Sequence, residues 1–231
     1  MRAVERSGHL FDQVYDILWE KILAGDIAPR QRLRDAELAQ QLNVSRTPAR
    51  EAMRKLEHDG ILLPLERGGY EVCDVRGGDL KGLYRCRAVL EALAAREATG
   101  RLTAAQAQLL AGLITRTEGL VAAEALAEAL TCNTLFHRTI IAASANRHLM
   151  RLLGSLERVI TFHRRALMAA AQGGAQTQGS YVAHIRQTQQ DHRAILDAMM
   201  AGDAERAARR MEDHLFRTAD DMDRIVQQLP G

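Results

Sequence analysis

Aromatic residues, proline and cysteine are all scarce in this chain of 231 residues. Aromatic residues make up 4% of it, and it contains 4 prolines and 3 cysteines. A chain that is poor in aromatic residues and rich in Ala, Leu and Arg favours helices over an all-β architecture. Its apolar content of 47% also argues against a disordered protein. The length suits one or two domains and is sufficient for a buried core.

The three cysteines, Cys73, Cys86 and Cys132, are odd in number and far apart. They form neither a CxxC zinc pattern nor a disulfide framework, which favours a reducing compartment. Long apolar runs are also lacking. The stretch 102–115, which has no charged residue, is too short to span a membrane, and charged residues begin at residue 2. We therefore expect a cytoplasmic protein without a signal peptide or a membrane anchor.

Neither sign of charge is in large excess, because 31 Lys and Arg residues accompany 29 Asp and Glu residues. No global field therefore draws the protein onto nucleic acid. The segment 30–55 is a local exception, with seven basic residues and three acidic ones. The basic residues are Arg30, Arg32, Arg34, Arg46, Arg50, Arg54 and Lys55. Any binding to nucleic acid is expected to come from such a local patch.

Apolar residues at helical spacing predict three helices in the first sixty residues. The first covers residues 10–24 and the second residues 35–42. The third begins after Ser45, which stands at an N-cap position, and ends at Gly60. Pro48 falls in its first turn, where the missing backbone N–H costs nothing.

The residues that follow predict a β-hairpin, because two apolar runs, 61–65 and 70–75, flank a Glu-Arg-Gly-Gly turn. Three helices and a hairpin indicate a winged helix-turn-helix domain, which we place at residues 1–76. The Gly-Gly-Asp step at residues 77–79 is the expected linker.

The rest of the chain, residues 77–231, shows helical periodicity only. The expected helices lie at about 79–99, 103–122, 124–143, 146–171, 178–201 and 203–227. Short connections between them predict an antiparallel six-helix bundle, so the fold is expected to be mainly α.

The second helix of the helix-turn-helix pair has the composition of a DNA-reading helix. Arg46, Arg50 and Arg54 share one face of it. A guanidinium can donate two parallel hydrogen bonds to a guanine edge or to a phosphate. Ser45 and Thr47 carry hydroxyl groups beside the helix start, where they are suited to contact phosphate oxygens.

At the tip of the predicted hairpin, Arg67 is followed by Gly68, and glycine lets a backbone approach DNA closely. A lone basic helix is usually only a solvated surface whose arginines pair with neighbouring glutamates. The combination of a basic helix, hydroxyl groups and a basic wing favours DNA binding instead.

The segment LRDAELAQQLNVSRTPAREAMRKLEHDGILLPLERGGYEV, residues 33–72, resembles the winged helix of the GntR family of transcription regulators. The resemblance implies a homodimer that binds a palindromic double-stranded DNA operator, usually as a repressor. It places the DNA contacts at Ser45, Arg46, Thr47, Arg50, Arg67 and Gly68. Relatives often carry arginine where this chain has Ala36, and we expect Arg34 to substitute for it.

Three of the eight histidines, His137, His192 and His214, lie within apolar helical stripes. If Gly202 marks the turn between antiparallel helices, His192 and His214 lie at heights that differ by about 3 Å. Buried imidazoles without partners are costly, and a divalent metal would use their lone pairs. The alternative is that they are ordinary core histidines. His9, His58, His148 and His184 are interpreted as surface or satisfied core residues.

The segments LYRCRAVLEALAAREA, NTLFHRTIIAASANRHL and DHRAILDAMMAGDAERAARRMEDHL are similar to the FCD-type effector-binding domain of the FadR subfamily, and especially its VanR-like branch. Many relatives bind a divalent metal through one Asp and three His. The matching residues here are Asn133, His137, His192 and His214. An amide oxygen can coordinate a metal but carries no charge, and three neutral imidazoles suit Zn or Ni better than Mg.

The same resemblance implies a small organic acid as effector. Arg87, four residues before Glu91, is the candidate clamp for its carboxylate, with an ordinary helix ion pair as the alternative. His163 and Arg165 are secondary pocket candidates, and core packing is the simpler interpretation of His163.

Three other functions stay open at this point: a regulator that binds its effector without metal, a metal-dependent enzyme and a DNA-architectural protein. The sequence has no HExxH motif, and we expect no acidic residue near the three histidines to supply a general base. A regulator is therefore expected rather than an enzyme.

Overall fold

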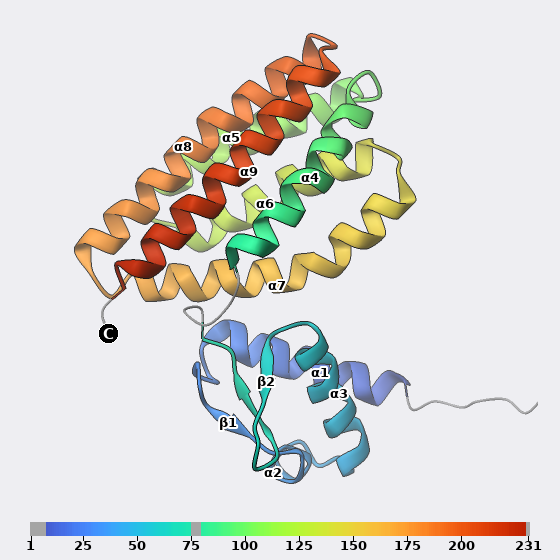
Figure 1. The fold of residues 1–231 in the computed structure, drawn as a ribbon, viewed down its shortest axis with the longest axis vertical. Helices are drawn as coiled ribbons and strands as arrows, with labels where there is room; N and C mark the ends of the chain where they lie inside the picture. The colour runs from blue at the N-terminus through green and yellow to red at the C-terminus, as the bar shows by residue number, and fades with distance from the viewer. Residues whose placement is uncertain (1–7, 75–79, 230–231) are drawn as a thin grey trace, which may run out of the picture. The chain divides into compact units, whose positions relative to one another are not determined.

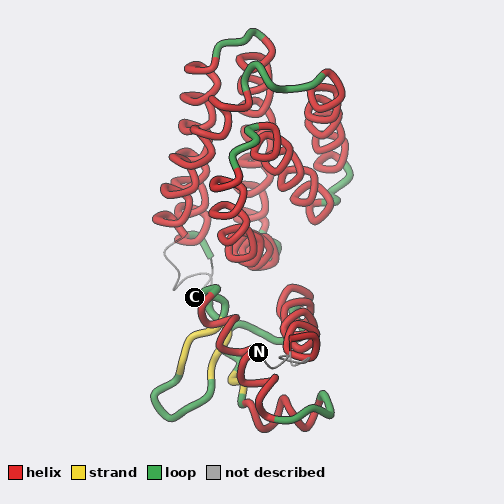
Figure 2. The backbone as a smooth tube through the Cα atoms, turned by 90° about the vertical axis from the view of Figure 1, so that its right-hand side faces the viewer, coloured by secondary structure: helices red, strands yellow, loops and turns green. Residues whose placement is uncertain are grey.

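The computed structural model describes residues 8–74 and 80–229. The chain divides into two compact units, Met1–Gly78 and Asp79–Gly231. Both are shown in Figure 1, and the strands, yellow in Figure 2, belong to the first unit. The predicted linker at residues 77–79 and the predicted boundary after residue 76 lie outside the described residues. The mainly helical fold with a small wing sheet confirms the predicted fold class.

The first unit contains three helices and three short strands within residues 8–74. They are α1 (Gly8–Ala24), β1 (Arg32–Leu33), α2 (Asp35–Gln41), α3 (Arg46–His58), β2 (Leu62–Pro64) and β3 (Tyr70–Val72). Helices α1 and α3 pack together around Tyr15, Leu18, Met53 and Leu56, which are all fully buried. The hydroxyl of Tyr15 donates a hydrogen bond of 2.6 Å to Asp59 and so ties α1 to the end of α3.

The wing is an antiparallel sheet with the strand order β1-β3-β2, in which Leu62 is opposite Val72. Strand β1 was not predicted, because it has two residues and pairs with a strand far along the chain. At the tip, the N–H of Leu65 donates to the carbonyl of Gly69 at 3.1 Å. Gly69 has a φ of +84°, and a Cβ there would lie 2.8 Å from the carbonyl oxygen of Leu33. Only glycine fits this position without a shift of the backbone.

The second unit is the predicted bundle of six helices, in the part of it that is described. The helices are α4 (Leu80–Ala98), α5 (Ala104–Ala122), α6 (Leu126–Ala143), α7 (Arg147–Ala171), α8 (Ala175–Met200) and α9 (Ala204–Gln227). Helix α9 packs along α4 and α8, and α5 packs against α6 and α8 (Figure 1). None of the helices in residues 8–74 and 80–229 has an apolar stretch that could cross a membrane.

The helix ends follow local signals. Thr103 caps α5 in a capping box with Gln106, and the side chain of Asn146 caps α7. Helix α6 begins two residues later than predicted, because Glu124 adopts a left-handed φ of 58°. Helix α8 begins at Ala175. The Gly-rich and Gln-rich composition of this segment had led to a predicted start three residues later.

Candidate functional site

Helix α3 is strongly amphipathic. Its buried face consists of Pro48, Ala49, Ala52, Met53 and Leu56. The opposite face exposes Arg46, Arg50 and Arg54. The predicted DNA-reading helix therefore has its arginines in solvent.

The carboxylate of Asp35, the first residue of α2, holds two of these arginines. Its oxygens lie 3.2 Å from Nη2 of Arg46 and 2.7 Å from Nη2 of Arg50. The hydrogen bonds from Arg50 are the main cause that lowers the pKa of Asp35, and those from Arg46 add to the effect. The Arg46 and Arg50 side chains remain 63% and 51% exposed. Asp35 thus aligns the two guanidinium groups and leaves them accessible to an anionic partner.

The other predicted DNA contacts are also at the surface. Ser45 has N-cap backbone geometry, but its side chain makes no capping hydrogen bond, and both Ser45 and Thr47 are exposed. Arg34 is exposed and lies 3.9 Å from Glu37. Arg67 and Gly68 are exposed at the hairpin tip, where Gly68 has a φ of +79°. Their contacts with DNA stay a prediction.

The second candidate site is the cluster of His137 on α6, His192 on α8 and His214 on α9, called here the histidine triad. The ring centroids are 4.9–5.4 Å apart, and one nitrogen of each ring lies within 4.8 Å of the others. All three side chains are buried. The predicted convergence of these rings is confirmed.

Two carboxylates hold the outer nitrogens of the triad. Nδ1 of His137 lies 2.6 Å from Glu91, and Nδ1 of His214 lies 3.3 Å from Asp191. Both arrangements leave Nε2 of the ring for another partner, as carboxylates that accept from the other ring nitrogen of metal-binding histidines do. Neither carboxylate contact was predicted. Glu91 was missed because it comes from α4, 46 residues away in the sequence.

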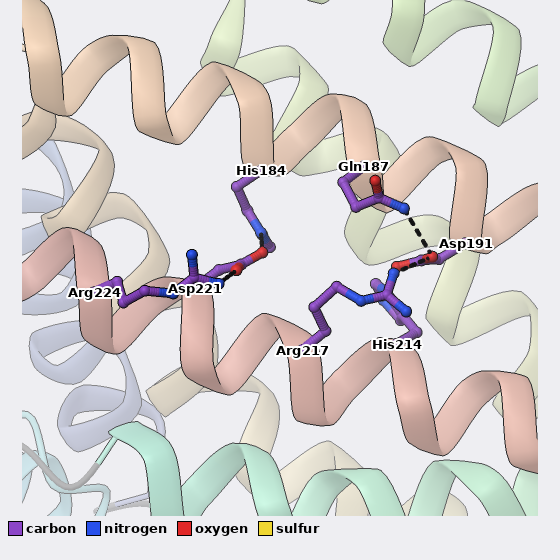
Figure 3. A network of polar contacts seen from close by, with 7 residues as sticks. All are labelled: His184, Gln187, Asp191, His214, Arg217, Asp221 and Arg224. Atoms are coloured by element: carbon purple, nitrogen blue, oxygen red, sulfur yellow. Dashed lines mark hydrogen bonds and ion pairs between the residues drawn. The ribbon is translucent and has the colours of Figure 1, made fainter.

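Asp191 also connects the triad to a polar network between α8 and α9 (Figure 3). Its carboxylate pairs with Arg217 at 2.5 Å and accepts a hydrogen bond from Gln187. A separate group between the same two helices, also drawn in Figure 3, contains His184, which lies 2.8 Å from Asp221. His184 is therefore a satisfied histidine, as predicted.

Burial lowers the pKa of each triad histidine, although Asp191 acts in the opposite direction on His214. Neutral rings are the form that coordinates a metal. Nε2 of His192 has no hydrogen-bond partner in the described part of the chain, and the ring stacks on Phe136 with centroids 3.9 Å apart. This donor set fits a nitrogen-preferring divalent ion such as Zn or Ni.

Asn133, the fourth predicted ligand, lies one turn before His137 and is also buried. With its amide oxygen facing α7, it accepts hydrogen bonds from both terminal nitrogens of Arg164, from Nη1 at 2.8 Å. The structure therefore brings the three histidines together and directs the amide of Asn133 to Arg164. Nothing in the sequence pattern identified Arg164.

A cavity of about 170 Å³ lies beside the triad. Its lining includes Arg87, Glu91 and His137, together with Arg138, Glu157 and Arg164. Arg87 is 4% exposed and forms an ion pair with Glu91, which was the alternative to its role as a clamp. Burial tends to lower the pKa of Arg87, but the charge and hydrogen bond of Glu91, together with Tyr84 and Glu157, raise it overall. Neither His163 nor Arg165 is among the residues that line this cavity.

Comparisons with known proteins match both units. The description "Bacterial regulatory proteins, gntR family" matches residues 10–72, and the FCD domain matches residues 82–217. The chain belongs to the GntR family of transcriptional regulators. It is a DNA-binding regulator with an FCD effector domain, and it is not an enzyme.

Among the relatives of this GntR-family protein is the HTH-type transcriptional regulator YdhC of Bacillus subtilis. It is 32% identical over 153 residues, which cover 66% of this chain and 68% of YdhC. A probable D-xylose utilization operon transcriptional repressor of Paenarthrobacter nicotinovorans is 28% identical over 88% of this chain and 84% of its own length. The solved structure of Escherichia coli McbR/YncC has the same fold, with a TM-score of 0.69 at 22% identity over 98% of this chain and 99% of McbR/YncC.

Proposed function

We propose that this GntR-family protein is a ligand-responsive repressor that acts in the cytoplasm. It binds a palindromic operator as a homodimer, with one winged helix in each half-site. The exposed arginine face of α3 supports this, because Arg46 and Arg50 present aligned guanidinium groups to solvent. The repressor name of the Paenarthrobacter relative supports the direction of regulation.

The triad is proposed to hold a divalent metal, Zn or Ni, through His137, His192 and His214. Glu91 and Asp191 orient two of the rings. When bound, the metal supplies open coordination positions that attract a carboxylate. Asn133 can join this ligand set only if its amide oxygen releases Arg164.

The effector is proposed to be a small organic acid that occupies the cavity beside His137. Arg87 lines this cavity and contributes to its positive wall. The acid favours one of two conformational populations of the protein, and its preference for that state sets how far operator affinity changes. The observation that carries this proposal is the convergence of three buried imidazoles next to a cavity with charged walls.

His192→Ala tests the proposal. We expect this variant to lose bound metal, by elemental analysis, while the metal-free protein still binds operator DNA. His148→Ala, a change at an exposed histidine of α7, is the matched control and should keep the metal. Equal metal content in the two variants would contradict the proposal.

A metal-free regulator is the second candidate. It is favoured by the two guanidinium groups, Arg87 and Arg164, that face the same cavity as His137, because positive charge disfavours a cation. In this case a chelator leaves operator binding unchanged, whereas His137→Ala, a change at a residue that lines the cavity, still alters the response to the acid.

A further inference from the structure

The carboxylate of Asp35 holds Arg50 and Arg46 in different ways. It accepts two hydrogen bonds from Arg50 at a single oxygen, Oδ2, which lies 2.9 Å from Nε and 2.7 Å from Nη2. Arg46 contacts the same carboxylate through Nη2 alone, at 3.2 and 3.3 Å. Asp35 therefore fixes the plane of the Arg50 guanidinium, whereas it holds the guanidinium of Arg46 at one nitrogen only.

The edge of Arg50 that Asp35 does not use is suited to a base. A guanidinium has five N–H groups, and those of Nε and one from Nη2 form the edge that faces Asp35. The edge between Nη1 and Nη2, called here the free edge, carries two more parallel N–H groups. Two parallel N–H groups of arginine match the O6 and N7 acceptors of guanine. The Arg50 side chain is 51% exposed, so this edge is within reach of a partner.

Asp35 also affects contacts with phosphate. Its hydrogen bonds with Arg50 and Arg46 lower its pKa, so the carboxylate is ionised at neutral pH. A phosphate that takes Arg50 from Asp35 breaks this pair and meets the negative charge that remains. A guanine that binds the free edge leaves the pair intact. Asp35 therefore disfavours phosphate contacts of Arg50 more than base contacts.

A simpler role for Asp35 is that of an acid at the start of α2. Asp35 and Glu37 both lie in the first turn of this helix, where negative charge is favoured by the helix dipole. This role does not require two hydrogen bonds from a side chain on α3, 15 positions along the chain. Glu37 is 62% exposed and lies 3.9 Å from Arg34. It is therefore a matched control for charge in this turn.

We infer that Asp35 is a positioning residue for base reading: it holds Arg50 with its free edge available to a guanine of the operator, and it leaves Arg46 to contact a phosphate. Arg50 then carries the specificity for one base pair in each half-site, and Arg46 contributes affinity without sequence preference. This assignment rests on the proposed function in so far as α3 enters the major groove of an operator.

The first test compares Arg50→Lys with Arg46→Lys, because lysine keeps the charge but lacks the planar fork of arginine. The probes are the palindromic duplex that the wild-type chain selects from a random pool, and duplexes in which each G·C pair of the half-site is replaced in turn by A·T. Fluorescence anisotropy with the full chain measures each affinity. We expect Arg50→Lys to lose about tenfold of the discrimination at one position, as for a bidentate base contact. Arg46→Lys should keep the wild-type preference at every position.

The second test uses Asp35→Asn, which removes the charge and keeps the size of the side chain. Discrimination at the position read by Arg50 should fall about fivefold or more. Affinity for an unrelated duplex of equal length should stay the same or rise, because a negative charge beside the phosphates is lost. Glu37→Gln removes a charge from the same turn of α2 and should keep the discrimination. Damage to the fold would weaken binding to all duplexes alike, so a loss at one position identifies the positioning role.

Three results would overturn the assignment. They are wild-type discrimination by Arg50→Lys, an equal loss of discrimination in Arg46→Lys, and an equal loss in Glu37→Gln and Asp35→Asn. An unchanged circular dichroism spectrum establishes that each variant is folded. Failure of the proposed function gives a different result: the wild-type chain then enriches no palindrome from the random pool, and the assignment fails with it.

Discussion

The two units each contain an arginine–carboxylate pair, and the two pairs differ chiefly in their exposure to water. In the first unit, Arg50 pairs with Asp35, and their side chains are 51% and 21% exposed. In the second, Arg87 pairs with Glu91, and their side chains are 5% and 2% exposed. The exposed pair contributes little to stability and can exchange its carboxylate for a DNA phosphate. The buried pair cannot be separated without leaving a charge in an apolar environment.

The same contrast applies to the residues around each pair. The basic residues on α3 are solvated, so their presence costs the fold nothing. In the second unit, the three imidazoles of the triad and the ion pair Arg87–Glu91 are buried in one region. The guanidinium of Arg164 beside them is half-buried. Burial of polar groups lowers stability unless each has a partner. A binding function explains why this arrangement is present at the centre of a bundle.

The largest predicted effect is the loss of the buried carboxylate. Glu91→Ala leaves the charge of Arg87 and Nδ1 of His137 without their partner, and it should reduce the free energy of unfolding by about 3–5 kcal/mol. Urea denaturation measures this change. Glu91→Gln keeps the shape and one hydrogen bond and should cost less. A loss below about 1 kcal/mol in Glu91→Ala would show that the pair is not buried as described.

The second prediction concerns pH. Burial lowers the pKa of His163 from 6.5 to about 4. Between these values the unfolded chain binds the proton and the folded chain does not, so stability is complete above pH 6.5 and falls as the pH falls toward 4. As the pH falls from about 7 to about 5, His163 alone should lower the free energy of unfolding by about 2 kcal/mol.

The pKa values of the triad histidines are also lowered, so these residues add to the same pH dependence. A comparison with a variant at position 163 separates the contribution of His163. His163→Gln cannot titrate and should lose about 2 kcal/mol less than the wild type over this range. Parallel pH dependence of the two proteins, measured by urea denaturation, would contradict the prediction.

The third prediction tests the exposed pair. Arg50→Ala should weaken operator binding by about 1 kcal/mol or more, because one bidentate contact is lost. It should change the free energy of unfolding by no more than about 0.5 kcal/mol. Fluorescence anisotropy with a palindromic duplex selected from a random pool measures binding. Arg151→Ala, at an exposed arginine of α7, is the control, and equal operator affinity of the two variants would show that α3 is not the reading helix.

The smallest effect is expected for the acidic partner of the exposed pair. Asp35→Asn removes the ion pairs with Arg46 and Arg50, and it should lower stability by less than about 1 kcal/mol because these groups are exposed. Thermal unfolding measures this change. A loss as large as that of Glu91→Ala would remove the contrast between the two units.

Local signals in the sequence predicted most of the fold. Helix ends were predicted well where a cap or a glycine marks them, as at Thr103 and Gly202. Strand β1 was missed because its pairing depends on residues far along the chain, as in Arg32 with Glu71, which are 39 positions apart. A periodicity argument contains no information about such a partner.

The candidate site shows the same limit. The three histidines could be predicted because each lies on an apolar stripe and a turn relates two of them. The pair Arg87–Glu91 could be predicted because it spans one helical turn. The contacts of Glu91 with His137 and of Arg164 with Asn133 could not, since each joins two helices whose relative rotation only the packing determines.

Operator affinity, measured on the same full-length protein after loading with Zn²⁺ and after treatment with a chelator, tests most directly whether the buried cluster controls the DNA-binding helix. We expect the dissociation constant for the selected palindromic duplex to differ by about fivefold or more between the two forms, as for an allosteric coupling. We expect His192→Ala to abolish this difference. Superimposable binding curves for the two wild-type forms would show that the triad does not control operator binding.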